Sequence, residues 1–194
     1  ALFEQGGDYR QAALCYSKAK ELRKAITNAE KINPKPYDML IDLYTEVGDK
    51  DKVNQYLDYL YIHDPGLYVA YYAKNGKTME LRTKAIGDQR YSIAIQTYGD
   101  YQSLNETEKD ELMDLYQKAG DKKGLSNLMN QRISDLLEHK KSLSISDFDT
   151  LIQYYSLMGN TAKVTEYQNK ANARKADIAK AEKFWIGKSY SFSS

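Results

Sequence analysis

A glycine followed by an aspartate or an asparagine returns along this chain at nearly regular intervals. Gly-Asp occurs at Gly7, Gly48, Gly87 and Gly120, and Gly-Asn occurs at Gly159. The successive spacings between these glycines are 41, 39, 33 and 39 residues. A sequence period of about 20–50 residues is typical of proteins built from structural repeats. This near-period therefore constrains the fold more than any other feature of the sequence.

The segments on both sides of these glycines have apolar residues at helical spacing. Before three of the glycines, one apolar pattern recurs at the same distance from the glycine (Tyr37, Leu40, Ile41 and Tyr44; Leu112, Met113 and Tyr116; Phe148, Leu151, Ile152 and Tyr155). After the same glycines, a second helical pattern follows (Val53, Tyr56, Leu57 and Leu60; Leu125, Leu128, Met129 and Arg132; Val164, Tyr167 and Ala171).

The Gly-Asp pair predicts a tight bend between two antiparallel helices. Glycine tolerates the left-handed conformation that ends a helix, and the next side chain can accept hydrogen bonds from the free N–H groups of the following helix. Because neither helix can bury its apolar face alone, such pairs are expected to stack on their neighbours. The alternative is an ordinary helix bundle, which would not need one apolar pattern at a fixed distance before each glycine.

Two stretches resemble tetratricopeptide repeats. YDMLIDLYTEVGDKDKVNQYLDYLYIHDP has the positions typical of that family (Tyr37, Leu40, Tyr44, Gly48, Val53, Leu57, Leu60 and the closing Asp64-Pro65). GDYRQAALCYSKAKEL supplies only the second helix of a unit (Gly7, Tyr9, Ala12, Tyr16 and Ala19). The resemblance covers most of the chain but is degenerate, because Ser92 and Leu125 replace small residues and most spacings exceed the family's roughly 34 residues.

The resemblance implies an all-α fold: a superhelical stack of antiparallel helix hairpins, or TPR-like α-solenoid, with about four to five repeats. Residues 65–87 depart from it, with two short helical pieces broken at Asn75-Gly76 where one helix is expected. RYSIAIQTYG supplies the partner helix, and we interpret Gly99-Asp100 as a loop. Asn105 and Glu108 predict a helix N-terminal cap.

A long C-terminal capping helix is predicted from Thr161 to about Ile186. Its apolar stripe continues beyond Ala171 through Ile178, Ala181 and Trp185, and a coiled coil with a partner is the alternative interpretation. We therefore expect a repeat domain over residues 1–187 and a flexible tail over residues 188–194. Because the domain starts in the middle of a repeat, we expect the chain to be a fragment of a longer protein.

The residues that catalysis or metal binding requires are scarce. The two histidines, His63 and His139, and the single cysteine, Cys15, cannot form a conventional zinc site. Cys15 is expected to be buried on a helix, and GDKKG at Gly120 lacks the pattern of a phosphate-binding loop. We therefore predict a protein that is not an enzyme, with no cofactor and no metal.

The net charge indicates little about a partner. The chain has 28 lysines and arginines against 27 aspartates and glutamates, and this balance argues weakly against a nucleic-acid partner. No apolar run approaches the roughly 20 residues of a membrane span. The compartment stays open, with the cytoplasm as the default, because an upstream targeting segment can be missing. The oligomeric state also stays open.

In the tetratricopeptide family, the first helices line a concave groove that takes a peptide. The resemblance therefore implies a non-catalytic protein–protein interaction scaffold, with polar residues of the first helices as its partner-binding face (Asp38, Asp42, Thr45, Asp110, Asp114, Gln117, Asp149, Gln153 and Ser156). The acidic members favour a Lys/Arg-rich protein or peptide partner, and the alternative is a merely solvated face.

Segments such as FDTLIQYYSLMGNTAKV also resemble pentatricopeptide repeats, which bind single-stranded RNA. Of the base-reading positions, Thr150 fits that pattern, whereas Met39 and Glu111 do not. A regulatory domain of a larger protein is the third possibility.

Overall fold

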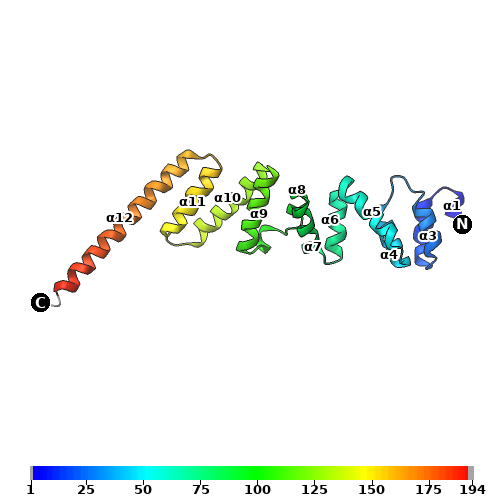
Figure 1. Ribbon diagram of the computed structural model, residues 1–194, viewed down its shortest axis with the longest axis horizontal. Helices are drawn as coiled ribbons and strands as arrows, with labels where there is room; N and C mark the ends of the chain where they lie inside the picture. The colour runs from blue at the N-terminus through cyan, green and yellow to red at the C-terminus, as the bar shows by residue number, and fades with distance from the viewer. Residues whose placement is uncertain (1, 192–194) are drawn as a thin grey trace. The chain divides into compact units, whose positions relative to one another are not determined.

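The structure is a computed structural model that describes residues 2–191, and within this range it contains helices and no strand (Figure 1). The prediction of an all-α fold is confirmed for this part of the chain. The chain divides into two compact units, which we call unit 1 (residues 1–99) and unit 2 (residues 100–194). In each unit the helices pack mainly against those next to them in the sequence.

Unit 1 begins with three helices, α1 (Leu2–Gln5), α2 (Tyr9–Lys18) and α3 (Leu22–Ala29). Gly7 has a φ of 76° at the bend between α1 and α2, and Lys20 has a φ of 60° at the bend between α2 and α3. The sequence interpretation had one helix over residues 7–22 and assigned none to the segment of α3. It missed the second bend because a lysine, not a glycine, adopts the left-handed conformation there.

The helices α4 (Tyr37–Val47) and α5 (Lys50–His63) form the hairpin that the sequence predicts. Gly48 ends α4 with a φ of 84°, a conformation that costs a residue with a Cβ about 1–2 kcal/mol. The Asp49 carboxylate then accepts a hydrogen bond of 3.1 Å from the backbone N–H of Lys52. The glycine and the aspartate thus have the two separate roles expected of them.

The end of unit 1 contains three short helices, α6 (Pro65–Lys74), α7 (Thr78–Gly87) and α8 (Tyr91–Ile95). As predicted, two helical pieces replace one long helix, and Gly76 between them has a φ of 67°. The helix predicted in RYSIAIQTYG extends over only five residues.

Gly87 differs from the other predicted bend glycines. It is the last residue of α7, and the left-handed residue of this bend is Gln89, with a φ of 57°. Asp88 does not cap the next helix, because its carboxylate is bound to the ammonium of Lys84 at 2.9 Å and Arg90 occupies the N-cap position. The assignment of Gly87 as an inter-helix turn is therefore corrected: the bend begins after it.

Unit 2 begins with a short 3-10 helix, η1 (Tyr101–Ser103), in the segment interpreted as a loop. The predicted cap follows, in which the Asn105 side chain accepts from the N–H of Glu108 at 2.9 Å and the Glu108 carboxylate accepts from the N–H of Asn105 at 3.0 Å. This capping box starts α9 (Glu106–Ala119).

The remaining helices of unit 2 form two further hairpins. Gly120, with a φ of 69°, ends α9, and α10 (Lys122–His139) follows. Gly159, with a φ of 71°, lies between α11 (Ile145–Leu157) and α12 (Thr161–Ser191). Asp121 and Asn160 accept backbone hydrogen bonds from the first turns of α10 and α12, at 2.8 and 3.1 Å.

The core of unit 2 lies between α10, α11 and α12, and its buried members include Met129, Leu151 and Tyr167. On α11 the predicted face is shifted, because Tyr154 is buried whereas the expected Tyr155 is half-buried. The reason is that α11 contacts α10 as well as α12, so its buried surface is wider than one stripe.

Helix α12 is longer than predicted and only partly packed. It continues through Ser191, so the boundary expected at residue 187 does not mark its end, and residues 192–194 of the expected tail lie outside the described residues. Ala171 is the last buried residue of α12 among those whose side chains are described, and the predicted stripe beyond it is exposed at Ile178 and Trp185. Figure 1 shows this second half extending past α11.

Candidate binding grooves

The structure divides the nine predicted partner-binding residues between the two units. Three are on α4 in unit 1, and six are on α9 and α11 in unit 2. All nine are exposed. Two of them, Asp38 and Asp42, line one hollow together, whereas the Thr45 hydroxyl donates to the Ile41 carbonyl of its own helix at 2.6 Å.

Unit 1 has a small groove between α4 and α6, with α5 below it, which we call groove 1. Its volume is about 240 Å³. Its apolar lining comes from all three helices (Ile41, Leu60, Leu67 and Ala70), and its polar lining comes from α4 and α6 (Asp38, Asp42, Tyr71 and Lys74). Ile41 and Leu60 are almost fully buried, so they form a fixed apolar floor.

The charged residues of groove 1 are at its rim. The Lys74 ammonium lies 2.9 Å from an Asp42 carboxylate oxygen, and this hydrogen bond raises the pKa of Lys74. Asp38 has no ion pair with another of the described residues. Two carboxylates and one ammonium leave this rim with a net negative charge.

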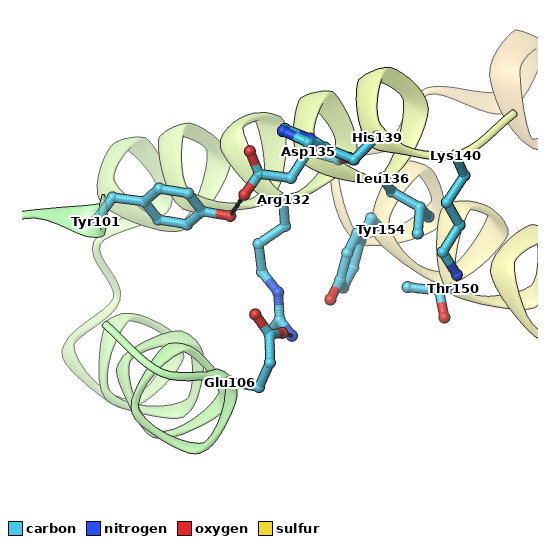
Figure 2. Close-up of a pocket in the computed structure, with 9 residues that line it drawn as sticks. All are labelled: Tyr101, Glu106, Arg132, Asp135, Leu136, His139, Lys140, Thr150 and Tyr154. Carbon is cyan, nitrogen blue, oxygen red and sulfur yellow. Dashed lines mark hydrogen bonds and ion pairs between the residues drawn. The ribbon is translucent and has the colours of Figure 1, made fainter. Parts of the chain in front are cut away.

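Unit 2 has a larger groove between α9 and α11, with α10 below it, which we call groove 2 (Figure 2). Its volume is about 420 Å³. Its lining is more polar than that of groove 1 and includes one aliphatic residue (Tyr101, Glu106, Arg132, Asp135, Leu136, His139, Lys140, Thr150 and Tyr154). None of the six residues predicted on α9 and α11 lines this hollow, although Asp110 contacts it through Arg132.

Arg132 is the central cation of groove 2. Its guanidinium binds Asp110 at 2.5 Å and Glu106 at 3.0 Å, and it contacts the Met113 sulfur at 3.2 Å. Burial alone would lower the pKa of Arg132, but the hydrogen bond to Asp110 and the nearby carboxylates outweigh burial and raise it. The Arg132 side chain is 12% exposed, whereas those of Glu106 and Asp110 are 73% and 70% exposed. The solvent therefore meets the carboxylates and not the cation.

The two ends of groove 2 are held by hydrogen bonds. At one end the Tyr101 hydroxyl donates to the Asp135 carboxylate, and burial followed by this bond raises the pKa of Tyr101. At the other end the Lys140 ammonium binds Asp147 at 2.5 Å. Asp147 also accepts from the backbone N–H of Ser144, and these bonds, with that from Lys140 the strongest, lower its pKa to about 2.

Sequence reasoning missed most of groove 2, but one signal was present. Arg132 occupies a position of the second helix where the other hairpins have apolar residues, and an arginine in that register indicates a covered charge with a partner. Tyr101 and Tyr154 had no comparable signal, because their roles depend on residues distant in the sequence.

The described residues show no site for metal chemistry, because no group of three or more histidine, cysteine, aspartate or glutamate side chains there could hold an ion. Cys15 is exposed, which corrects the expectation that it would be buried. No helix in residues 2–191 is both long enough and apolar enough to cross a membrane.

In comparisons with family models, curated proteins and solved structures, nothing matched this chain.

Proposed function

We propose that this chain is a non-catalytic protein-interaction scaffold whose grooves bind segments of a partner protein that contain lysine or arginine. In this proposal the helix pairs are units of a tetratricopeptide-like α-solenoid, and each groove is the binding surface of its own unit. The equivalent left-handed bends at Gly48, Gly120 and Gly159 support the repeat interpretation.

The observation that supports binding most directly is the equivalent placement of the two grooves. Groove 1 lies between α4 and α6 with α5 below, and groove 2 lies between α9 and α11 with α10 below. In both cases two first helices form the walls and the intervening second helix forms the floor. A scaffold built from repeated hairpins offers the same kind of surface once per repeat.

The charges of both grooves favour a cationic segment. Groove 1 has Asp38, which has no ion pair with another described residue, beside the Asp42–Lys74 pair. Groove 2 has Asp135 without an ion pair among the described residues, while its Arg132 is covered and bound by Glu106 and Asp110. Complementary potential speeds encounter and selects partners, even where it adds little affinity. The same carboxylates would repel the phosphates of single-stranded RNA, so the charges favour the peptide over the nucleic acid.

A peptide array tests this proposal. The chain is applied to synthetic peptides that contain Lys or Arg beside Leu or Phe, with sequence-scrambled and Glu-substituted peptides on the same array. We expect binding of the cationic amphipathic peptides, weakened by salt and abolished by the Glu substitutions. Failure of every peptide to bind would contradict the proposal.

Matched variants locate the binding surface. Asp38→Asn removes an exposed carboxylate at groove 1, and Asp58→Asn removes an exposed carboxylate of the same unit outside both grooves. We expect the first change to weaken peptide binding by about 2–5-fold, the range of an exposed charge pair, and the second to leave it unchanged. Equal effects of the two variants would contradict the assignment of the groove.

A further inference from the structure

Tyr154 differs from the other polar residues of groove 2 because its hydroxyl has no hydrogen-bond partner among residues 2–191. The residue is 6% exposed, and its ring packs in the unit 2 core. Burial raises the pKa of its hydroxyl, so the phenol stays protonated and remains a hydrogen-bond donor. Among the described residues, no group accepts a hydrogen bond from it.

The Tyr154 hydroxyl is directed into groove 2. Figure 2 shows it pointing into the hollow, on the side that the tips of Arg132 and Lys140 also reach. The side chain is buried, but its hydroxyl opens onto the groove, so an acceptor on a ligand can reach this donor.

The acceptor is expected to be neutral. Arg132 already binds two carboxylates and Lys140 binds one, so neither cation of the groove is uncompensated. With Lys109, which binds Glu106 at 2.8 Å, three cations lie among four carboxylates (Glu106, Asp110, Asp135 and Asp147), so an added carboxylate or phosphate would meet a surplus of negative charge. A carbonyl oxygen can accept from Tyr154 without this cost. The Asp135 carboxylate, which has no ion pair with another of the described residues, leaves a place for a cationic side chain in the same groove.

A main-chain carbonyl of a partner is available only in some conformations. In a helical peptide the carbonyls are paired within the helix, apart from those of the last turn. In an extended peptide they are free, and one can accept a hydrogen bond from a side chain in the groove.

We propose that groove 2 binds an extended segment of a partner protein, with one of its main-chain carbonyls accepting from the Tyr154 hydroxyl and a Lys or Arg side chain beside Asp135. This inference rests on the proposed scaffold function. It adds the conformation of the bound segment and names Tyr154 as the residue that recognises its main-chain carbonyl. Tyr154 is then a specificity-determining residue for extended over helical segments.

The first experiment compares Tyr154→Phe with Tyr155→Phe. Both variants lose one hydroxyl from α11, but Tyr155 stacks on Tyr167 and does not line the groove. The probe is the strongest binder from the cationic peptide array, measured by calorimetry with each variant. We expect Tyr154→Phe to weaken binding by about 3–10-fold, the net value of one hydrogen bond, and Tyr155→Phe to have no effect.

The second experiment changes the peptide. Each main-chain amide of the probe is replaced in turn by a trans-alkene isostere, which removes one carbonyl together with its N–H and preserves the extended shape. At one position the replacement should weaken binding to the wild-type protein by the same factor as Tyr154→Phe does. The Tyr154→Phe variant should bind this modified peptide as weakly as it binds the unmodified probe. A hydrocarbon-stapled helical form of the probe should bind the wild-type protein more weakly, and Tyr154→Phe should not alter its affinity.

The outcomes separate this inference from the scaffold proposal. If the probe binds wild type and Tyr154→Phe equally, the carbonyl contact is overturned and the scaffold stands. If the stapled helix binds as tightly as the extended probe, the extended conformation is overturned. If no array peptide binds at all, both proposals are overturned. Thermal unfolding of Tyr154→Phe should match the wild type, because no protein hydrogen bond is lost, and this checks that reduced binding does not reflect misfolding.

Discussion

The guanidinium of Arg132 lies over the ring of Tyr154, with its central carbon 5.5 Å from the ring centroid. This contact joins α10 to α11, while the ion pairs of the same guanidinium with Glu106 and Asp110 join α10 to α9. One side chain therefore connects the floor of groove 2 to both of its walls.

Replacement of Arg132 is expected to destabilise unit 2. Arg132→Ala removes two ion pairs and the contact with Tyr154, and we expect the free energy of unfolding to fall by about 1–3 kcal/mol. Lys123→Ala on the same helix removes an exposed charge and should change it by less than about 0.5 kcal/mol. Urea unfolding followed by circular dichroism measures both, and equal losses would show that Arg132 does not connect the three helices.

The bends of unit 1 give a second prediction. Gly48→Ala places a Cβ at a φ of 84°, and we expect it to lower the free energy of unfolding by about 1–2 kcal/mol. Gly87→Ala should be neutral or stabilising by up to about 1 kcal/mol, because Gly87 lies at a helix end with no positive φ and with open space around its Cβ position. Thermal unfolding compares the two variants, and similar losses would show that Gly87 also requires the left-handed conformation.

The acid stability of unit 2 should depend on Asp147. Its pKa is about 2 in the folded protein against 3.8 for the ordinary group, so its ionised form is favoured by folding. Its stabilising contribution is complete above pH 3.8 and is lost as the pH falls through about 2. Across this range, the stability of Asp147→Asn should fall less steeply than that of the wild type, whereas Asp149→Asn, an exposed residue of the same helix, should follow the wild type. Parallel slopes for all three proteins would contradict the assignment.

Truncation tests whether the second half of α12 contributes to the fold. A chain that ends at Lys175 retains Tyr167 and Ala171, so its free energy of unfolding should be within about 0.5 kcal/mol of that of the full chain. A chain that ends at Glu166 loses both buried residues and should be less stable by about 3 kcal/mol or more. A large loss in the first truncation would mean that Ile178 and Trp185 are packed in solution.

The sequence predicted the bends well where the constraint was local. A left-handed residue is most readily glycine, so Gly48, Gly120 and Gly159 could be identified from the sequence alone. Lys20 and Gln89 adopt the same conformation without that signal, because the packing of the surrounding helices outweighs their intrinsic preference. The helix α3 and the true position of the bend after Gly87 were missed for this reason.

The candidate site was less predictable than the fold. Asp38 and Asp42 were expected to share a face, since residues four apart on a helix do so, and they line groove 1. Groove 2 instead depends on Tyr101, Arg132 and Tyr154, which come from three segments of the chain. The side of α11 that is buried depends on its contacts with both α10 and α12. The apolar pattern of α11 alone therefore could not decide whether Tyr154 or Tyr155 is the buried residue.

The pairing of each helix with those beside it has a consequence for how the chain folds. Few contacts require distant parts of the sequence to meet, so little loop-closure entropy opposes the first productive encounters. Proteins with such low contact order refold in times on the order of microseconds to milliseconds, and we expect the same of each unit.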